Sequence, residues 1–309
     1  MLKVQYGWIF VGILLHATSF LGMTLRSKLM LQPLYNFKWT TLFKSVFVSF
    51  TGNNIFPLRA GEVLRIDYLA RQGEVPHSSV LAVVFVERLL DLLFLATLFF
   101  VAIPMFLSNK NVSVDSVYLP AAIAITSLVV IVLMSLFPKQ IMAIAEKVTG
   151  ILPEKLSTFI LEKLELFVNG LSALKSPWRV LLVLLSTGFF WLMNNLVILT
   201  WIWAFSLHTQ LPWYASIIIQ TFVAFGAALP SAPGFVGTYH WFVKRSLMLM
   251  GIGATQANSF ALVVHAANII PLTIFGLLFL LPEYLKSPET FRPTAGEEEL
   301  LTAHPPANP

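Results

Sequence analysis

Three charged side chains lie inside an apolar stretch that is long enough to cross a membrane. Glu87, Arg88 and Asp91 fall within the run 79–104, where each charge costs about 2.5–3.5 kcal/mol at the centre of a membrane helix. On a helix, Glu87 and Asp91 share a face, and Arg88 can pair with Asp91 three residues later. These groups either bind a charged substrate or form a self-neutralising set that locks helices together.

A second set of charges follows Pro57, which interrupts another apolar run. Arg59 and Arg65 come just after this proline, where a short helix can begin. Helix N-termini and guanidinium groups both suit phosphate, and a lipid phosphate is the obvious anion beside a membrane. We therefore predict a headgroup site that includes Asn54, while the alternatives are solvated loop charges and a capping role for Asn54. The charged residues of this segment are Arg59, Glu62, Arg65, Asp67, Arg71 and Glu74.

Two polar residues lie inside the last apolar run. His265 and Asn268 are three residues apart, so they share one face of a helix. When the two halves of the chain are aligned on their turns, His265 falls opposite Glu87. His265 and Asn268 are therefore candidates for substrate contacts facing Glu87 and Arg88, or for hydrogen bonds between helices.

The composition explains why apolar runs dominate the chain. Of 309 residues, 57% are hydrophobic and 11% are charged, against about 45–50% and about 25% in soluble domains. A bilayer can cover this apolar surface, and about 20 apolar residues in a helix cross it. The runs do not alternate, which excludes a membrane β-barrel. We expect an all-α integral membrane protein, built as a helical bundle.

Basic residues set the expected topology. The net charge of +5 indicates positive loops on the cytoplasmic side rather than nucleic-acid binding. The basic loops 25–44 and 138–179 lie on the same side of the membrane only if the run 39–57 enters the membrane and returns to the side from which it came. Otherwise the two loops lie on opposite sides, and the rule that basic loops are cytoplasmic does not hold for this chain. We predict about five full spans and two broken, re-entrant elements, 39–57 and 212–229. The apolar runs are 4–24, 39–57, 79–104, 118–137, 179–205, 212–229 and 255–282.

The two broken elements resemble each other. Phe56–Gly61 and Leu229–Gly234 both have the pattern P-x-x-x-G after a short apolar run, and each is followed by a glycine turn and a long span. An odd number of spans separates them, which predicts inverted repeats with a substrate site at their interface. The small residues of the second copy suit a close approach by a ligand or by another helix. The predicted hinge residues are Pro57, Gly61, Pro230, Pro233, Gly234 and Gly237.

We expect a single transmembrane domain over residues 1–285. Repeat 1 covers about 4–137 and repeat 2 about 179–282, with a linker at 138–178 and a disordered tail at 286–309. The linker has apolar residues on one helical face, which indicates a helix at the membrane interface or one packed on the bundle.

Motifs of soluble enzymes are missing from the sequence. There is no Walker A loop, no H-E-x-x-H and no G-x-S-x-G, and the chain contains no cysteine. We therefore expect no cofactor and no metal site, and a transporter rather than an enzyme.

The chain resembles the lysylphosphatidylglycerol synthase transmembrane family, whose members are also described as flippase-like. The resemblance rests on the segment Gly52–Arg65, on Glu87–Asp91, and on Leu229–Gly237, in which Phe235 replaces the usual small residue. It covers about residues 4–282. In the best-understood members, as the resemblance implies, this domain moves an aminoacylated phospholipid between leaflets, and a fused cytosolic domain makes that lipid. No counterpart of the synthase domain is expected here, so neither is aminoacyl transfer.

The leading hypothesis is a multi-pass protein of the cell membrane that translocates a phospholipid or an isoprenoid-type lipid. A separate lipid synthase is the expected protein partner. The alternatives are a membrane glycosyltransferase or other lipid-modifying enzyme, with Glu62 or Asp67 as its carboxylate, and a non-catalytic partner of a lipid pathway.

Overall fold

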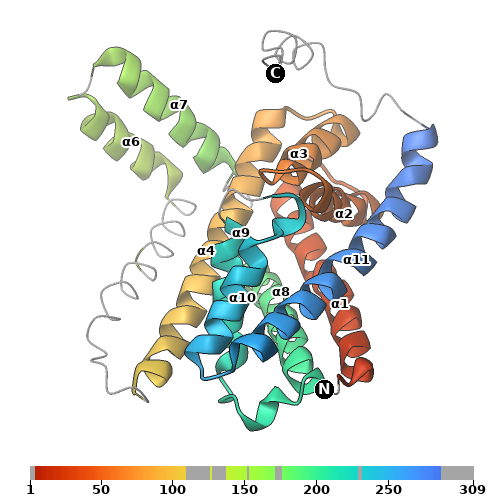
Figure 1. The fold of residues 1–309 in the computed structure, drawn as a ribbon. Helices are drawn as coiled ribbons and strands as arrows, with labels where there is room; N and C mark the ends of the chain where they lie inside the picture. The colour runs from red at the N-terminus through yellow and green to blue at the C-terminus, as the bar shows by residue number, and fades with distance from the viewer. Residues whose placement is uncertain are drawn as a thin grey trace, which may run out of the picture.

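Every regular element in the described part of the chain is a helix, as expected for an all-α membrane protein. The structure, a computed structural model, describes residues 4–108, 126, 137–151, 153–170, 176–228 and 232–286. Figure 1 shows a bundle of helices from which one pair, α6 and α7, projects sideways. The α-helices are α1 (Tyr6–Leu31), α2 (Trp39–Ile55), α3 (Ala60–Gly73), α4 (His77–Ser108), α6 (Pro138–Thr149), α7 (Glu154–Gly170), α8 (Pro177–Ala204), α9 (Ala215–Ala228), α10 (Thr238–Leu249) and α11 (Ala254–Lys286), with 3-10 turns η2 (Leu207–Thr209) and η3 (Pro233–Phe235).

α1 and α8 pack against each other along much of their length and run antiparallel. Just before α1, the backbone N–H of Gln5 donates to the carbonyl of Ala204 at the end of α8, at 2.8 Å. Towards the other end of α1, Gly22 lies against Phe189 in the first half of α8. A Cβ atom at Gly22 would come within 2.7 Å of this ring, so the small residue permits the close contact.

α2 and α3 form a first hairpin, called hairpin 1. The turn between them, residues 56–59, is called break 1. Phe56 is extended before Pro57, as residues before proline usually are, and α2 stops there. Gly73 at the end of α3 lies against Phe37, just before α2. The chain therefore turns back at Pro57, and hairpin 1 begins and ends on the same side.

α9 and α10 form a second hairpin, called hairpin 2. The connection is break 2, residues 229–237, of which 232–237 are described and contain η3. Gly226 near the end of α9 lies against Phe242 in α10. Met250, just after α10, packs on the apolar cluster that contains Tyr214, just before α9. Hairpin 2 therefore also turns back on itself.

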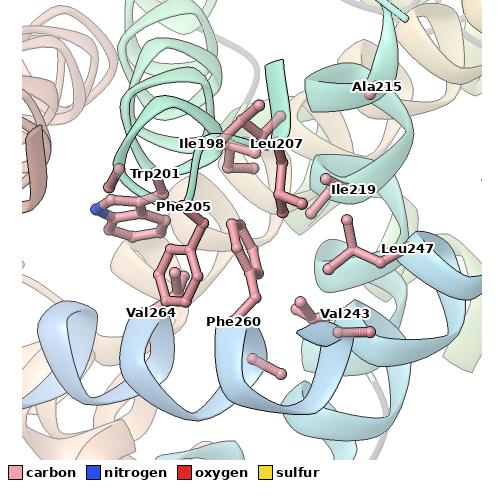
Figure 2. Packing of buried hydrophobic residues seen from close by; sticks show 14 of the residues in the cluster. Ile198, Trp201, Phe205, Leu207, Ala215, Ile219, Val243, Leu247, Phe260 and Val264 are labelled. Atoms are coloured by element: carbon pink, nitrogen blue, oxygen red, sulfur yellow. The ribbon is translucent and has the colours of Figure 1, made fainter. Parts of the chain in front are cut away.

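The two hairpins approach each other from opposite ends of α8. The base of hairpin 1 shares an apolar cluster, including Tyr68, with Val183 in the first turns of α8. The base of hairpin 2 shares another cluster, including Leu247, with Phe205 just after α8 (Figure 2). There the rings of Phe205 and Phe260 lie 5.1 Å apart. Since α2 of hairpin 1 packs on η3 of hairpin 2, the tips of the two hairpins meet between these ends.

The helices follow one another in two similar series. α1, α2, α3 and α4 have 26, 17, 14 and 32 residues. α8, α9, α10 and α11 repeat this order of long, short, short and long, with 28, 14, 12 and 33 residues. The two series are alike in the order of their helix lengths, and the inverted repeat stays a prediction.

Within the described residues, three helices are long and apolar enough to cross a membrane, namely α1, α8 and residues Ala254–Leu280 of α11. α4 has 32 residues and carries the three predicted charges in its first half. The expected span 118–137 lies almost wholly outside the described residues, as does the tail after Lys286. The count of five full spans therefore stays a prediction.

The structure corrects the expected end of the first helix. The apolar run 4–24 predicts a helix that stops before a basic loop at 25–44, but α1 continues to Leu31 and buries Arg26. A cation can extend a membrane helix where a carboxylate from a neighbouring helix faces it. Asp91 of α4 supplies that carboxylate.

Candidate functional site

The carboxylate of Asp91 is buried and held by a bidentate pair with Arg26. Nη1 and Nη2 of Arg26 donate to its two oxygens at 2.6 and 3.2 Å. The indole of Trp191 in α8 donates to the same carboxylate at 3.1 Å, and Nη1 of Arg88 lies 3.3 Å from it. Arg26 is 0% exposed and Asp91 6%, so water screens this pair little. The pair joins α1 to α4, and the indole adds α8.

Glu87 is buried beside that pair and has its own partners. Nη1 of Arg65 in α3 donates to its Oε2 at 2.8 Å, and the hydroxyl of Ser27 in α1 donates to its Oε1 at 2.7 Å. Nη2 of Arg65 also donates to the Ser27 oxygen at 2.6 Å. Glu87 and Asp91 thus already hold guanidinium groups, which favours helix locking over binding of a cationic headgroup.

Sequence reasoning missed Arg26 and Ser27, because they follow the apolar run that defined the first helix. One signal pointed to Arg26. Carboxylates buried in a membrane require matching cations, and Arg26 lies two residues after the end of the first apolar run, 4–24.

Three further charged residues, Arg59, Glu62 and Arg88, form a looser group called the open charge group. Nε of Arg88 lies 3.8 Å from Oε1 of Glu62, and the Arg88 side chain is 30% exposed. Several buried atoms of this group have no hydrogen-bond partner among the described residues: Nε of Arg59, Nε and Nη2 of Arg88, and Oε2 of Glu62. In the network of Glu87 and Asp91, by contrast, the carboxylate oxygens have partners, and only Nε of Arg26 and Nε of Arg65 have none in the described part of the chain.

The charges at this place do not cancel. The looser group lies next to the locked network, since Arg88 contacts Asp91 of that network and Arg59 interacts electrostatically with Arg88, Glu62 and Asp91. Four guanidinium groups meet three carboxylates, which leaves one positive charge. The cations are Arg26, Arg59, Arg65 and Arg88, and the anions are Glu62, Glu87 and Asp91.

Break 1 and break 2 meet beside the open charge group. The guanidinium of Arg59 lies over the ring of Phe235, 6.0 Å from its centroid. A Cβ atom at Gly234 would lie 3.5 Å from the carbonyl oxygen of Asn54. The Asn54 amide also donates to the hydroxyl of Thr273 in α11 at 2.7 Å. The tips of the two hairpins are therefore in contact with each other and with α11.

Both tips contain residues in the left-handed region of backbone conformation. Arg59 has a φ of 59° and Phe235 a φ of 58°, although neither is glycine. Such conformations cost about 1–3 kcal/mol each and cluster at ligand sites and switches. The two strained residues face each other across the contact between the breaks.

His265 and Asn268 lie elsewhere than the repeat alignment predicts. Nε2 of His265 is 2.8 Å from the Gly234 carbonyl, and its ring stacks on Tyr239 with centroids 4.4 Å apart. Asn268 lies beside His16 of α1. His265 therefore supports break 2, and neither residue is placed with Glu87, whose partners come from α1 and α3.

The predicted hinge residues have different surroundings. Gly234 and Gly237 have φ values of 60° and 88°, so both provide backbone freedom in break 2. Gly61 instead lies against α2, where a Cβ atom would collide with the carbonyl of Ser49. Pro57 and Pro233 lie in the breaks, while Pro230 is outside the described residues.

Asp67, the other carboxylate considered for lipid chemistry, is paired. Its Oδ2 lies 2.8 Å from Nε of Arg71, and its Oδ1 lies 2.9 Å from Nε2 of His77. The structure thus gives Asp67 a role in joining the end of α3 to the start of α4.

Comparison with known protein families identifies the family of the chain. Residues 1–276 match the sequence model described as the lysylphosphatidylglycerol synthase TM region. Neither the curated proteins nor the solved structures contain a match to the chain.

Proposed function

Because the chain belongs to the family of the lysylphosphatidylglycerol synthase TM region, a membrane domain, we propose that it moves a phospholipid or lipid-linked headgroup between membrane leaflets. The observation that carries the proposal is the contact between the two broken hairpins at Arg59, beside unpaired donors of Arg88. We take the protein to be a multi-pass protein of the cell membrane and a transporter rather than an enzyme. A separate synthase would supply its lipid.

The open charge group would hold the headgroup phosphate. Its excess positive charge and free N–H donors match an anion with several acceptor oxygens. Glu87 and Asp91 would not contact the lipid, because their oxygens are already bonded. Arg59 is the key ligand, since it lies at the tip of hairpin 1 and packs on the tip of hairpin 2.

Inverted repeats would provide the mechanism of movement. The counterpart helices α1 and α8 run antiparallel, and the hairpins point inward from opposite ends of α8. In such transporters, one half rocks against the other around a site at the interface. Here the re-entrant hairpins would part at the contact of Arg59 with Phe235, and the glycines of break 2 would absorb the change of angle.

The test is lipid exchange in reconstituted vesicles. A fluorescent phosphatidylglycerol is placed in both leaflets, and its transfer is followed by quenching the outer leaflet with an impermeant reductant. Arg59→Gln should slow exchange roughly tenfold or more, because a hydrogen bond to a charged group contributes about 1.5–3 kcal/mol. A labelled ceramide, which lacks phosphate, should not depend on Arg59.

Lys38→Gln is the matched control, because Lys38 is an exposed cation at the start of α2, far along the helix from break 1. It should leave exchange unchanged. Equal exchange by Arg59→Gln and Lys38→Gln proteins of equal melting temperature would overturn the assignment of the site. No exchange by the unmodified protein with any phosphate-bearing lipid would overturn the proposed transport.

A further inference from the structure

α6 and α7 form a helical hairpin that projects from the side of the bundle (Figure 1). The two helices pack on each other, and α7 packs on α4. The hydroxyl of Ser157 in α7 donates to that of Thr149 in α6 at 3.1 Å, and Thr149 is buried. The face of α6 that carries Thr149 is therefore the face turned towards α7.

The other side of α6 carries an apolar stripe with no partner among the described residues. Its members follow one another at steps of three and four, so they share one helical face. Ile144 is 59% exposed, Val148 60% and Ile151, in the turn to α7, 85%. Thr149 lies about 100° around the helix from Val148, which separates the stripe from the packed face. The stripe consists of Phe137, Ile141, Ile144, Val148 and Ile151.

Polar residues border this stripe. Lys147 and Gln140 lie on one side of it, and Glu146 lies on the opposite face of the helix, all three exposed. An exposed apolar stripe on a short amphipathic helix with a lysine at its edge is the pattern of helices that lie in the plane of a membrane surface.

The position of the hairpin puts a bilayer within its reach. α7 rests on α4, and α8 begins soon after α7. Trp178 in the first turn of α8 is 65% exposed, and Arg179 follows it. Exposed tryptophan and basic residues at a helix end mark the level of the lipid headgroups. The apolar stripe thus belongs to a hairpin that connects to the bundle near this level.

We propose that α6 lies in the headgroup boundary of this leaflet, with its apolar stripe about 5–10 Å into the membrane. The partner is the lipid surface itself. Lys147 extends towards the lipid phosphates, and Glu146 faces water. This anchoring is independent of the proposed lipid movement, since it uses none of the residues of the breaks or of the open charge group.

Spin labels test the proposal, because the chain has no cysteine and each label can be placed alone. Ile144→Cys, Val148→Cys and the control Glu146→Cys are each labelled with a nitroxide in the full chain. The proteins are reconstituted, at less than one molecule per vesicle, in phosphatidylcholine with a minority of phosphatidylglycerol. Collisions are measured with oxygen, which concentrates among acyl chains, and with a water-soluble nickel chelate.

Labels at Ile144 and Val148 should collide mainly with oxygen and report a depth of about 5–10 Å below the phosphates. The label at Glu146 should collide mainly with nickel. Nickel access at all three positions would overturn the proposal, because the stripe would then face water. Shielding of the stripe labels from both reagents would also overturn it, because the stripe would then pack on protein.

Discussion

At the scale of single residues, Glu87 and Asp91 sit among helices that are far apart in sequence. Arg26 comes 65 residues before Asp91, and Arg65 comes 22 before Glu87. Buried ion pairs often add little net stability, since desolvation offsets the attraction, but removing one partner leaves a charge stranded. The network therefore fixes how α1, α3 and α4 are oriented.

Arg26→Ala should destabilise the protein by about 3–5 kcal/mol, because Asp91 would lose its bidentate partner while buried. Arg88 also contacts the Asp91 carboxylate, but it cannot fully replace Arg26, because it pairs with Glu62 as well. The measurement is the melting temperature in detergent, followed by tryptophan fluorescence. Lys38→Ala, at an exposed position, should melt like the unmodified protein. Equal melting of the two variants would show that Arg26 is not required for this packing.

The sequence identifies the charged residues of α4 but not the partner that each of them binds. Glu87, Arg88 and Asp91 are recognisable because charges are rare in apolar helices. Spacing along one helix favours the pair of Arg88 with Asp91, and that contact exists at 3.3 Å. The closer partner, Arg26, comes from another helix, and no local pattern predicts which helices will meet.

At the scale of elements, the closest approach within hairpin 1 occurs at two glycines. A Cβ atom at Gly52 would come within 2.6 Å of the Cα atom of Gly61. Small residues facing each other let two helix backbones pack at short distance. Gly61 is predicted to be a hinge, and in the structure it also permits the close packing of α2 and α3.

Gly61→Ala should destabilise the protein by about 1–3 kcal/mol, because the new methyl would meet the backbone of α2 and force the helices apart. Gly7→Ala is the control, since Gly7 is helical and, in the part of the chain that the structure describes, no atom from outside its own helical turn lies within 4 Å of its Cβ position. That substitution should be neutral or stabilise by about 0.5–1 kcal/mol. Thermal melting of both variants in detergent distinguishes the cases; a Gly61→Ala protein as stable as Gly7→Ala would argue against close packing.

Break 2 depends on backbone conformation rather than on space. Gly237 has a φ of 88°, and no atom of its described neighbours lies within 4 Å of a Cβ position, so an added methyl would clash with none of them. Gly237→Ala should still cost about 1–3 kcal/mol, because L residues avoid this conformation. Gly253→Ala is matched, since its Cβ position is equally open and its φ is not positive. Equal melting temperatures for these two variants would contradict the strained conformation.

The sequence locates the end of α2 at Pro57, but it does not identify the residues that meet between the two hairpins. Pro57 ends α2 through local chemistry, because proline disfavours helix at the residue before it. The contact of Arg59 with Phe235 joins residues from the two halves of the chain and depends on how both hairpins pack. The resemblance implies a small residue at position 235, yet the Phe235 ring lies under the Arg59 guanidinium. This arrangement follows from packing, not from either segment alone.

At the scale of the whole molecule, tryptophans mark both ends of the bundle. One end carries Lys28 at the end of α1, Lys38 just before α2, and Trp178, which is 65% exposed. The other end carries Trp213, which is 70% exposed. Basic residues favour the cytoplasmic side, and tryptophan belongs to membrane interfaces. The basic end, from which hairpin 1 enters, is therefore expected in the cytoplasm.

This orientation can be tested with single cysteines, which are specific because the native chain has none. Gln210 and Lys38 are both exposed and lie near opposite ends of the bundle, after α8 and before α2. In intact cells an impermeant thiol reagent should modify Gln210→Cys, whereas Lys38→Cys should react only after permeabilisation. The reason is that charged lysines stay on the cytoplasmic side during insertion. Labelling of Lys38→Cys in intact cells, with Gln210→Cys protected, would reverse the orientation, and hairpin 1 would then enter from outside.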